Sequence, residues 1–105
     1  MAFWAKDPTV YIMSNTYRTV FYVGVTGYPW FRIPMHKKGI GSIFAARYRC
    51  KDLVYFERHP TMKIAIRREK RLKRWRRKWK LELIQKMNPG MKDLYSSLMA
   101  EMRII

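Results

Sequence analysis

The segment from about Met62 to Lys80 constrains the fold of this chain most strongly. Between residues 62 and 81 it contains eleven Lys or Arg residues and a single acid, Glu69. Its apolar residues recur at steps of three and four, and they are Met62, Ala65, Ile66, Leu72, Trp75 and Trp79. This spacing is typical of an amphipathic helix that packs one stripe against a core. The segment therefore predicts one long basic helix on a core that the rest of the chain supplies.

Glu69 falls on the apolar side of this predicted helix. It lies four residues after Ala65 and three before Leu72, so it points the same way as they do. A carboxylate directed toward a core or cleft is costly unless something binds it. One interpretation is a salt-bridged glutamate at the edge of the helix, and the other is a metal ligand that faces a site built by other segments. The segment alone leaves both open.

The charge of the chain indicates a polyanionic partner. The 105 residues suffice for one small domain, and 23 Lys or Arg residues against 7 Asp or Glu residues give a formal net charge of +16. Cations that meet phosphates release condensed counterions, which favours nucleic acid as the partner. A basic amphipathic helix can also lie on an anionic membrane surface, so that role is the competitor.

Other features of composition exclude several classes of protein. No stretch approaches eighteen consecutive apolar residues, and the first residues lack the apolar core of a signal peptide. We therefore expect a cytoplasmic protein with no membrane partner. The single cysteine, Cys50, excludes an internal disulfide and a cysteine-based zinc site.

The first third of the chain predicts a β-hairpin. Residues 9–13 and 19–25 are rich in β-branched and aromatic side chains, and a polar run separates them. If the turn lies at the centre of that run, Tyr11 stands opposite Tyr22, and opposed residues have Cβ atoms about 5 Å apart on one face. Gly24 is on the same face and is expected to leave room for another group to approach the backbone.

Residues 28–39 predict a short helix with an irregularity. An interior proline costs roughly 3 kcal/mol, so Pro34 implies that the helix begins near Ile33 or that its first turns are irregular. Arg32 and His36 are four residues apart and share one face if the helix is continuous.

The remaining segments complete an α+β architecture. Residues 40–50 read as a loop or irregular crossover and residues 51–57 as a third strand. The helical pattern continues or restarts past Arg76 until Asn88-Pro89-Gly90, and residues 92–99 form a last amphipathic helix. We predict a small three-stranded mixed or antiparallel sheet flanked by helices, in β-β-α-β-α-α-α order.

The ordered set of motifs resembles the GIY-YIG nuclease superfamily. Thr9-Val10-Tyr11 and Tyr22-Val23-Gly24 stand eleven residues apart, as the two signature tripeptides of that family do. Arg32, His36, Tyr48 and the segment around Glu69 follow in the family's order. The likeness is greatest to minimal single-domain members and to the incision module of excision-repair endonucleases. It implies a nuclease domain over residues 9–95, with an N-terminal arm at 1–8 and a C-terminal helical tail at 96–105.

The resemblance implies metal-dependent hydrolysis of phosphodiester bonds in DNA, including structure-directed or repair-related cleavage. The catalytic residues that it indicates are Tyr11, Tyr22, Arg32, His36, Tyr48 and Glu69. A single carboxylate suffices for one Mg²⁺ or Mn²⁺, which takes its other ligands from phosphate and water, so Glu69 is the expected metal ligand. The Arg32 fork suits two phosphate oxygens. Either tyrosine could take the proton from water, and His36 or Tyr48 could orient the scissile group or assist the leaving oxygen.

The basic side chains are expected to hold the nucleic-acid backbone without reading its sequence. The residues expected to do so are Lys37, Arg68, Arg71, Arg74 and Arg77. DNA is the expected partner and RNA stays open, as does the oligomeric state, and no small-molecule substrate is expected. The alternative function is a non-catalytic nucleic-acid-binding module on the same fold.

Overall fold

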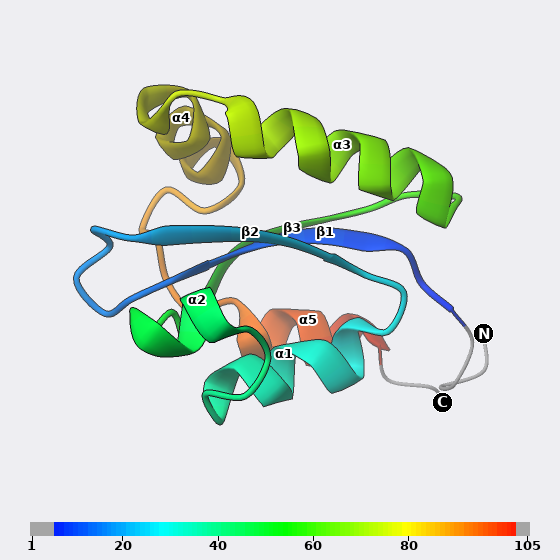
Figure 1. The fold of residues 1–105 in the computed structure, drawn as a ribbon, viewed down its shortest axis with the longest axis horizontal. Coiled ribbons are helices and arrows are strands. Elements are labelled where there is room, and N and C mark those ends of the chain that lie inside the picture. The colour runs from blue at the N-terminus through cyan, green and yellow to red at the C-terminus, as the bar shows by residue number, and fades with distance from the viewer. Residues whose placement is uncertain (1–5, 103–105) are drawn as a thin grey trace.

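A three-stranded antiparallel sheet lies between two layers of helices in the computed structural model, which describes residues 6–102 (Figure 1). The strand order is β2-β1-β3, so β1 is central and the other two strands are edges. Helices α3 and α4 cover one face, and α1, α2 and α5 cover the other. The elements are β1 (Thr9–Ser14), β2 (Phe21–Thr26), α1 (Pro29–Lys37), α2 (Ile43–Arg47), β3 (Asp52–Arg58), α3 (Met62–Arg74), α4 (Arg77–Met87) and α5 (Tyr95–Met102).

The central strand β1 divides the core into two parts because successive side chains of a strand point to opposite faces. Every residue of β1 is buried. Val10 and Ile12 pack with residues of α3 and α4, whereas Tyr11 and Met13 pack with residues of α1 and α5. The predicted α+β class and the antiparallel alternative for the sheet are confirmed.

The predicted hairpin is present, but its predicted register is wrong. Tyr11 pairs with Gly24, and Tyr22 pairs with Met13. The side-chain oxygen of Asn15 accepts hydrogen bonds from the backbone N–H groups of residues 19 and 20, which closes a longer loop than a turn centred in the polar run. Tyr11 and Tyr22 still share a face as diagonal neighbours, with ring centroids 6.4 Å apart.

Two helices on the lower face in Figure 1 differ from the prediction. Helix α1 is continuous from Pro29 to Lys37 and includes Pro34, so neither a start near Ile33 nor an irregular first turn is found. Burial of Trp30 and Ile33 before the proline and of His36 after it anchors the helix on both sides, and the proline removes only one backbone hydrogen bond. Helix α2 falls within residues 40–50, which were predicted to be irregular. Its N-cap is Ser42, whose hydroxyl accepts the N–H of residue 45.

The predicted long basic helix is two helices, because the chain breaks at Trp75 and Arg76. Both residues have extended backbone with ψ near 150°. An unbroken helix over residues 62–87 would be about 39 Å long, whereas the longest dimension of the molecule is 36 Å. The break turns α4 back so that Ile84 packs in the core on the same face as α3. Thr61 is the N-cap of α3, and its hydroxyl oxygen accepts a hydrogen bond from the backbone N–H of Ile64.

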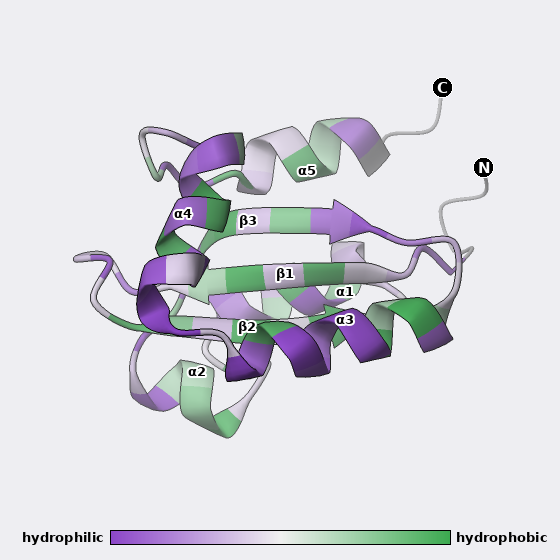
Figure 2. Ribbon diagram, turned by 90° about the horizontal axis from the view of Figure 1, so that it is seen from above, coloured by the Kyte–Doolittle hydropathy of each residue, from purple (hydrophilic) through white to green (hydrophobic). Residues whose placement is uncertain are grey.

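The apolar stripe predicted along the basic segment is only partly buried. Ala65 and Leu72 are fully buried, but Ile66 is 38% exposed and Trp79 is 48% exposed. The break before α4 moves Trp79 out of phase with α3, and Ile66 lies at the margin of a stripe narrower than predicted. Figure 2 shows that most of α3 consists of hydrophilic residues and that its hydrophobic residues lie mainly in its first half.

The ends of the chain lie partly outside the described residues. Residues 1–5 of the predicted arm and residues 103–105 of the predicted tail are among those not described. Within the described part of the tail, Leu98 of α5 is fully buried in the core beside α1. The division into arm, domain and tail stays a prediction. Of the helices between residues 6 and 102, none has the length and apolar character that crossing a membrane requires.

Candidate functional site

The candidate site is built around the Tyr11 phenol, which projects from the central strand toward the edge strand β2. A Cβ atom at position 24 would collide with the Tyr11 ring, so Gly24 is needed for the ring to lie there. Gly24 thus leaves room at the backbone, as predicted, and the group that takes this room is the Tyr11 ring itself. Burial, foremost, and the neighbouring Tyr22 raise the pKa of the Tyr11 phenol, so it is protonated near neutral pH.

His36 lies in the last turn of α1 and contacts the Tyr11 hydroxyl. Its Nε2 atom is 2.7 Å from the Tyr11 oxygen, and the residue is 1% exposed. Burial and then the charge of Arg32 lower the pKa of His36 to about 4, so the imidazole is neutral at pH 7. A Cβ atom at Gly41 would lie 2.5 Å from Nδ1 of His36, so that glycine allows the ring its position. Nδ1 is buried and has no hydrogen-bond partner within residues 6–102.

Arg32 lies one helical turn before His36, as the spacing predicted for a continuous helix, and its guanidinium is beside both tyrosines. Burial by itself lowers the pKa of Arg32, but interaction with Tyr11 and Tyr22 outweighs burial and raises it. Its Nε atom is buried and finds no acceptor in the described part of the chain. A buried donor of this kind is unusual in folded proteins unless a ligand uses it.

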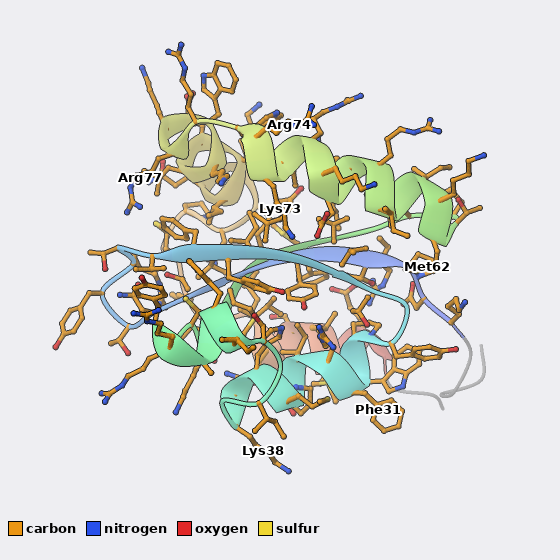
Figure 3. The ribbon with its side chains drawn as sticks, viewed as in Figure 1. Phe31, Lys38, Met62, Lys73, Arg74 and Arg77 are labelled. Atoms are coloured by element: carbon orange, nitrogen blue, oxygen red, sulfur yellow. The ribbon has the colours of Figure 1, made fainter. Side chains whose placement is uncertain are left out.

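Glu69 lies on α3, which covers the face of the sheet opposite to α1. Helix α3 packs along the edge strand β2, and the negative charge of Glu69 contributes to the raised pKa of Tyr11. The Glu69 side chain is 12% exposed, and its Oε2 atom lies 2.9 Å from Nζ of Lys73. Figure 3 shows Lys73 extending from α3 toward β2. The salt-bridge interpretation of Glu69 is thus realised. No hydrogen bond or ion pair joins its carboxylate to Tyr11, Arg32 or His36 within residues 6–102, and the role of metal ligand stays a prediction.

A row of aromatic rings extends the site onto α2. Tyr22 lies 5.3 Å from His36 and 6.1 Å from Phe44 between ring centroids, and Phe44 lies 4.8 Å from Tyr48. Among the ring contacts of the described residues, Tyr48 contacts Phe44 but not Tyr22. A catalytic role for Tyr48 stays a prediction. Sequence reasoning missed Phe44 because residues 40–50 were read as a loop. The capping residue Ser42 could have indicated the helix that carries it.

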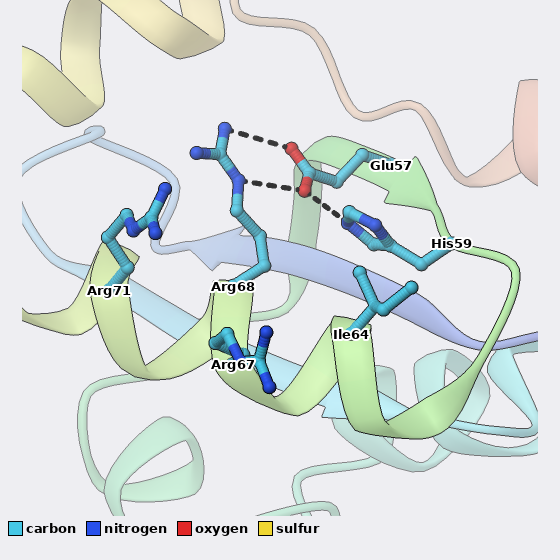
Figure 4. Close-up of a pocket in the computed structure, with 6 residues that line it drawn as sticks. All are labelled: Glu57, His59, Ile64, Arg67, Arg68 and Arg71. Carbon is cyan, nitrogen blue, oxygen red and sulfur yellow. Dashed lines mark hydrogen bonds and ion pairs between the residues drawn. The ribbon is translucent and has the colours of Figure 1, made fainter.

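Arg68, expected to bind nucleic acid, belongs to a second polar cluster at the β3 edge (Figure 4). We define the β3 cluster as Tyr55, Glu57, His59 and Arg68. The Arg68 guanidinium donates two hydrogen bonds to Glu57, at 2.9 and 3.2 Å. Glu57 also accepts one from the Tyr55 hydroxyl at 2.5 Å, and its Oε2 lies 2.5 Å from Nε2 of His59. Arg68 is therefore paired within the fold. Figure 4 shows the pocket beside this pair, and Arg71 lies along it together with Glu57, His59 and Arg68.

Two more of the predicted phosphate contacts already have partners. Lys37 forms an ion pair with Asp93 and lies over the Tyr95 ring, which ties α1 to the segment leading into α5. Arg77 donates to a backbone carbonyl oxygen and lies over the Phe21 ring. For Arg71 and Arg74, the residues that the structure describes supply no ion pair, and both are exposed. The nucleic-acid-binding set as a whole stays a prediction.

The candidate site has few side chains that could bind a divalent cation. Between residues 6 and 102 there is no group of three or more His, Cys, Asp or Glu side chains that could hold a metal ion. Among the charged groups that shift the pKa of Tyr11, Glu69 is the one carboxylate. Mg²⁺ commonly takes one or two carboxylates and completes its shell with substrate phosphate and water. The donor set thus fits a cation that binds together with a phosphate.

Comparison with known families identifies a catalytic domain in the chain. The family model for the GIY-YIG catalytic domain matches residues 7–82, a range that includes all six residues predicted to be catalytic. Comparison with curated proteins and with solved structures gives no significant match.

Proposed function

Because the chain belongs to the GIY-YIG family of phosphodiester-hydrolysing nucleases, we propose that it is an endonuclease that cleaves DNA with a divalent cation held by Glu69. The observation that carries this proposal is the Tyr11–His36 hydrogen bond beside Arg32, whose buried Nε donor has no acceptor in the described residues. The Tyr11–His36 pair could accept a proton, and the Arg32 guanidinium beside it has a donor free for a phosphate oxygen. Phosphodiester hydrolysis needs both, a group that takes a proton from water and a cation that binds the phosphate.

Arg32 is proposed to bind the scissile phosphate. Its planar fork can donate to two phosphate oxygens at once, and its Nε is one of the donors available for this. Because the guanidinium is partly buried, water competes less for these bonds, and a preorganised donor in such a place stabilises the additional charge of the transition state.

Tyr11 and His36 are proposed to take the proton of the attacking water. The water oxygen forms a bond to phosphorus while its proton passes to the Tyr11 oxygen. The proton of Tyr11 moves in turn across the 2.7 Å contact to Nε2 of His36, which is neutral at pH 7 and can accept it. The bond from phosphorus to one sugar oxygen breaks, and that oxygen takes a proton from solvent. We assign this role to Tyr11 rather than Tyr22 because the hydrogen bond to His36 belongs to Tyr11.

Glu69 is proposed to hold Mg²⁺ or Mn²⁺. When bound, the cation supplies positive charge beside the scissile phosphate, which one arginine alone neutralises incompletely. Lys73 now pairs with Glu69 and therefore holds the carboxylate in place before a cation arrives. The same pair supports the alternative of a non-catalytic nucleic-acid-binding module, since it already neutralises the acid.

DNA is proposed as the substrate, with structure-directed or repair-related cleavage as the role. The net charge of +16 supports binding to a polyanion, and the exposed Arg71 and Arg74 are the best placed of the predicted contacts to meet phosphates. Such contacts position the backbone without reading sequence, which is consistent with selection by structure rather than by sequence.

The proposal is tested by adding Mg²⁺ and then EDTA to nicked, branched and single-stranded DNA and to matched RNA, with wild-type protein and Glu69→Ala. Metal-dependent DNA products that disappear in Glu69→Ala, while binding at fixed salt is retained, would support the enzyme. Binding without product under any metal, unchanged in Glu69→Ala, would establish the non-catalytic module instead. Preferential cleavage of the RNA panel would contradict the choice of DNA.

A further inference from the structure

Helix α1 has apolar side chains on two opposite faces, and folding explains only one of them. The inner face places Trp30 and Ile33 in the core, at 5% and 0% exposure. The outer face carries Phe31 and Met35, which are 61% and 36% exposed, and Tyr28, the residue just before the helix, is 41% exposed beside them. A surface helix normally presents polar residues to solvent, and a group of exposed apolar side chains marks a contact surface.

These outer residues line a groove that has Arg32 in common with the candidate site. The groove has a volume of about 320 Å³ and is lined by Thr26, Tyr28, Phe31, Arg32 and Met35. Its lining contains one cation and no acid. Figure 3 shows Phe31 projecting from α1 away from the sheet. Arg32 lines this groove and also lies beside Tyr11 and Tyr22, so the groove and the site share a side chain.

We propose that this groove, which we call the α1 groove, holds an unstacked base of the strand that is cut. The inference rests on the proposed function, which places the scissile phosphate at Arg32. A nucleotide joins a phosphate to a flat ring with apolar faces and a polar edge. With its phosphate on Arg32, the strand brings a neighbouring base to the aromatic and thioether side chains of the groove, on which a base can stack.

The α1 groove therefore predicts the class of substrate. A base inside a continuous duplex is stacked and paired and has to be extruded at some cost, whereas a base in a single strand, a flap or a mismatch is already available. The enzyme is thus specific for DNA in which the nucleotide next to the cut is unpaired. The base is held by stacking, so this selection is independent of its identity.

Charge favours a nucleic-acid strand over the other occupants that an apolar groove could take. A second copy of this chain would bring two molecules of net charge +16 together, and their repulsion opposes that contact. An apolar protein segment would leave the Arg32 guanidinium at the end of the groove without an anion. A DNA strand supplies an anion and an apolar ring at adjacent positions.

The test is binding in EDTA, where no cleavage occurs, measured by fluorescence anisotropy at fixed salt. The probes are a single-stranded oligonucleotide, the same strand in a blunt duplex, and single-stranded versions with one abasic position moved along the strand. Phe31→Ala is expected to weaken binding of the single strand by about tenfold, which is the usual effect of losing one base–aromatic stack, and to leave the duplex unchanged. Phe31→Trp is expected to restore binding. In wild type one abasic position should weaken binding by a similar factor, and in Phe31→Ala that position should have no effect.

Matched controls separate stacking from other effects. Tyr17→Ala removes another aromatic side chain, 85% exposed, in the hairpin loop outside the groove, and should change no affinity. Met35→Ala provides a second groove variant in case Phe31→Ala misfolds. Equal loss for single strand and duplex, or no loss in either groove variant, would overturn the base-binding groove while leaving the nuclease proposal intact. A wild-type dimer that Phe31→Ala converts to monomer would also overturn it. Absence of nucleic-acid binding by wild type would contradict the proposed function first.

Discussion

The two edges of the sheet carry clusters of the same four residue types. One, which we call the β2 cluster, lies where the Tyr11 ring packs against β2; it comprises Tyr11, His36 and Arg32, with Glu69 near enough for its charge to affect Tyr11. The β3 cluster comprises Tyr55, His59, Arg68 and Glu57. In the β3 cluster the acid is saturated, because Arg68, Tyr55 and His59 all contact its two oxygens. Burial raises the pKa of Glu57, but these hydrogen bonds outweigh it and lower that pKa, as expected of a stabilised carboxylate.

The β2 cluster is left open by comparison. Nε of Arg32 and Nδ1 of His36 are buried without partners in the part of the chain that the structure describes, and Glu69 is paired with Lys73 alone among the ion pairs of that part. The contrast indicates that residue types alone do not identify a chemical site. Buried polar atoms without partners are the better guide, because leaving such an atom unpaired costs free energy that a bound ligand would recover.

The largest expected effect is the difference between two variants, in which Glu69 or Glu57 is replaced by glutamine. Glu69→Gln should reduce cleavage to the background level, because it removes the proposed metal ligand. It should leave the free energy of unfolding nearly unchanged, because an i,i+4 pair such as Glu69–Lys73 contributes only about 0.3–0.5 kcal/mol. Glu57→Gln should keep cleavage and lower the free energy of unfolding by about 2 kcal/mol, since it weakens charge-assisted hydrogen bonds. Cleavage assays and urea denaturation of both variants measure this. Loss of cleavage in Glu57→Gln with folding intact would reverse the assignment of the two clusters.

The tyrosines give the next largest effect. Tyr11→Phe should reduce kcat by about 10²–10⁴-fold, the usual contribution of a general base. Tyr55→Phe should leave kcat unchanged, because its hydroxyl is used within the β3 cluster. Single-turnover cleavage, with the protein in excess over the DNA and at a concentration above the Kd, isolates the chemical step. Tyr22→Phe serves as the control within the site, and a greater loss in Tyr22→Phe than in Tyr11→Phe would move the base to Tyr22.

The arginines give a smaller but more specific effect. Arg32→Lys keeps the charge and loses the planar fork, so kcat should fall by about 10²-fold, as when one donor to a transition-state oxygen is removed. Arg68→Lys should leave kcat unchanged and lower the melting temperature, because the two-point bond to Glu57 is lost. Both variants are compared by single-turnover cleavage and thermal unfolding. Full activity in Arg32→Lys would show that charge alone is needed there.

The dependence of stability on pH gives the smallest effect and tests whether His36 is neutral. The pKa of His36 is about 4 in the folded protein, against an ordinary value near 6.5. Between these values the unfolded chain binds a proton that the folded protein does not, so the free energy of unfolding should fall as pH is lowered from about 6.5 to 4. His36→Gln should show a smaller fall over the same range in urea denaturation. An identical fall in both proteins would mean that folding does not lower the pKa of His36, which would contradict the buried environment described for its imidazole.

The sequence predicted the β2 cluster better than it predicted the path of the chain to it. Glu69 stood out as a single acid in a basic run, and Arg32 and His36 were readable from a spacing of four. The hairpin register was not readable, because it depends on how the Asn15 side chain closes the loop. Lys73 could have been paired with Glu69 from its spacing alone.

The β3 cluster shows where sequence reasoning ends. Arg68 was predicted to face phosphate because it lies in a basic helix. Its partner Glu57 lies on β3, eleven residues earlier, and no local pattern joins a strand residue to a helix residue across a turn. Only the packing of α3 on the sheet brings them together, and packing also sets the helix break at Trp75.

The most direct test of the contrast between the clusters is to find where a divalent cation binds. Mn²⁺ is added to the protein in the presence of a short DNA strand with an uncleavable backbone, and paramagnetic broadening of assigned NMR signals is recorded. Broadening centred on Glu69, Tyr11 and Arg32, and lost in Glu69→Gln, is the result that we predict. Broadening centred on Glu57 and His59, or broadening that persists around Tyr11 in Glu69→Gln, would contradict the account.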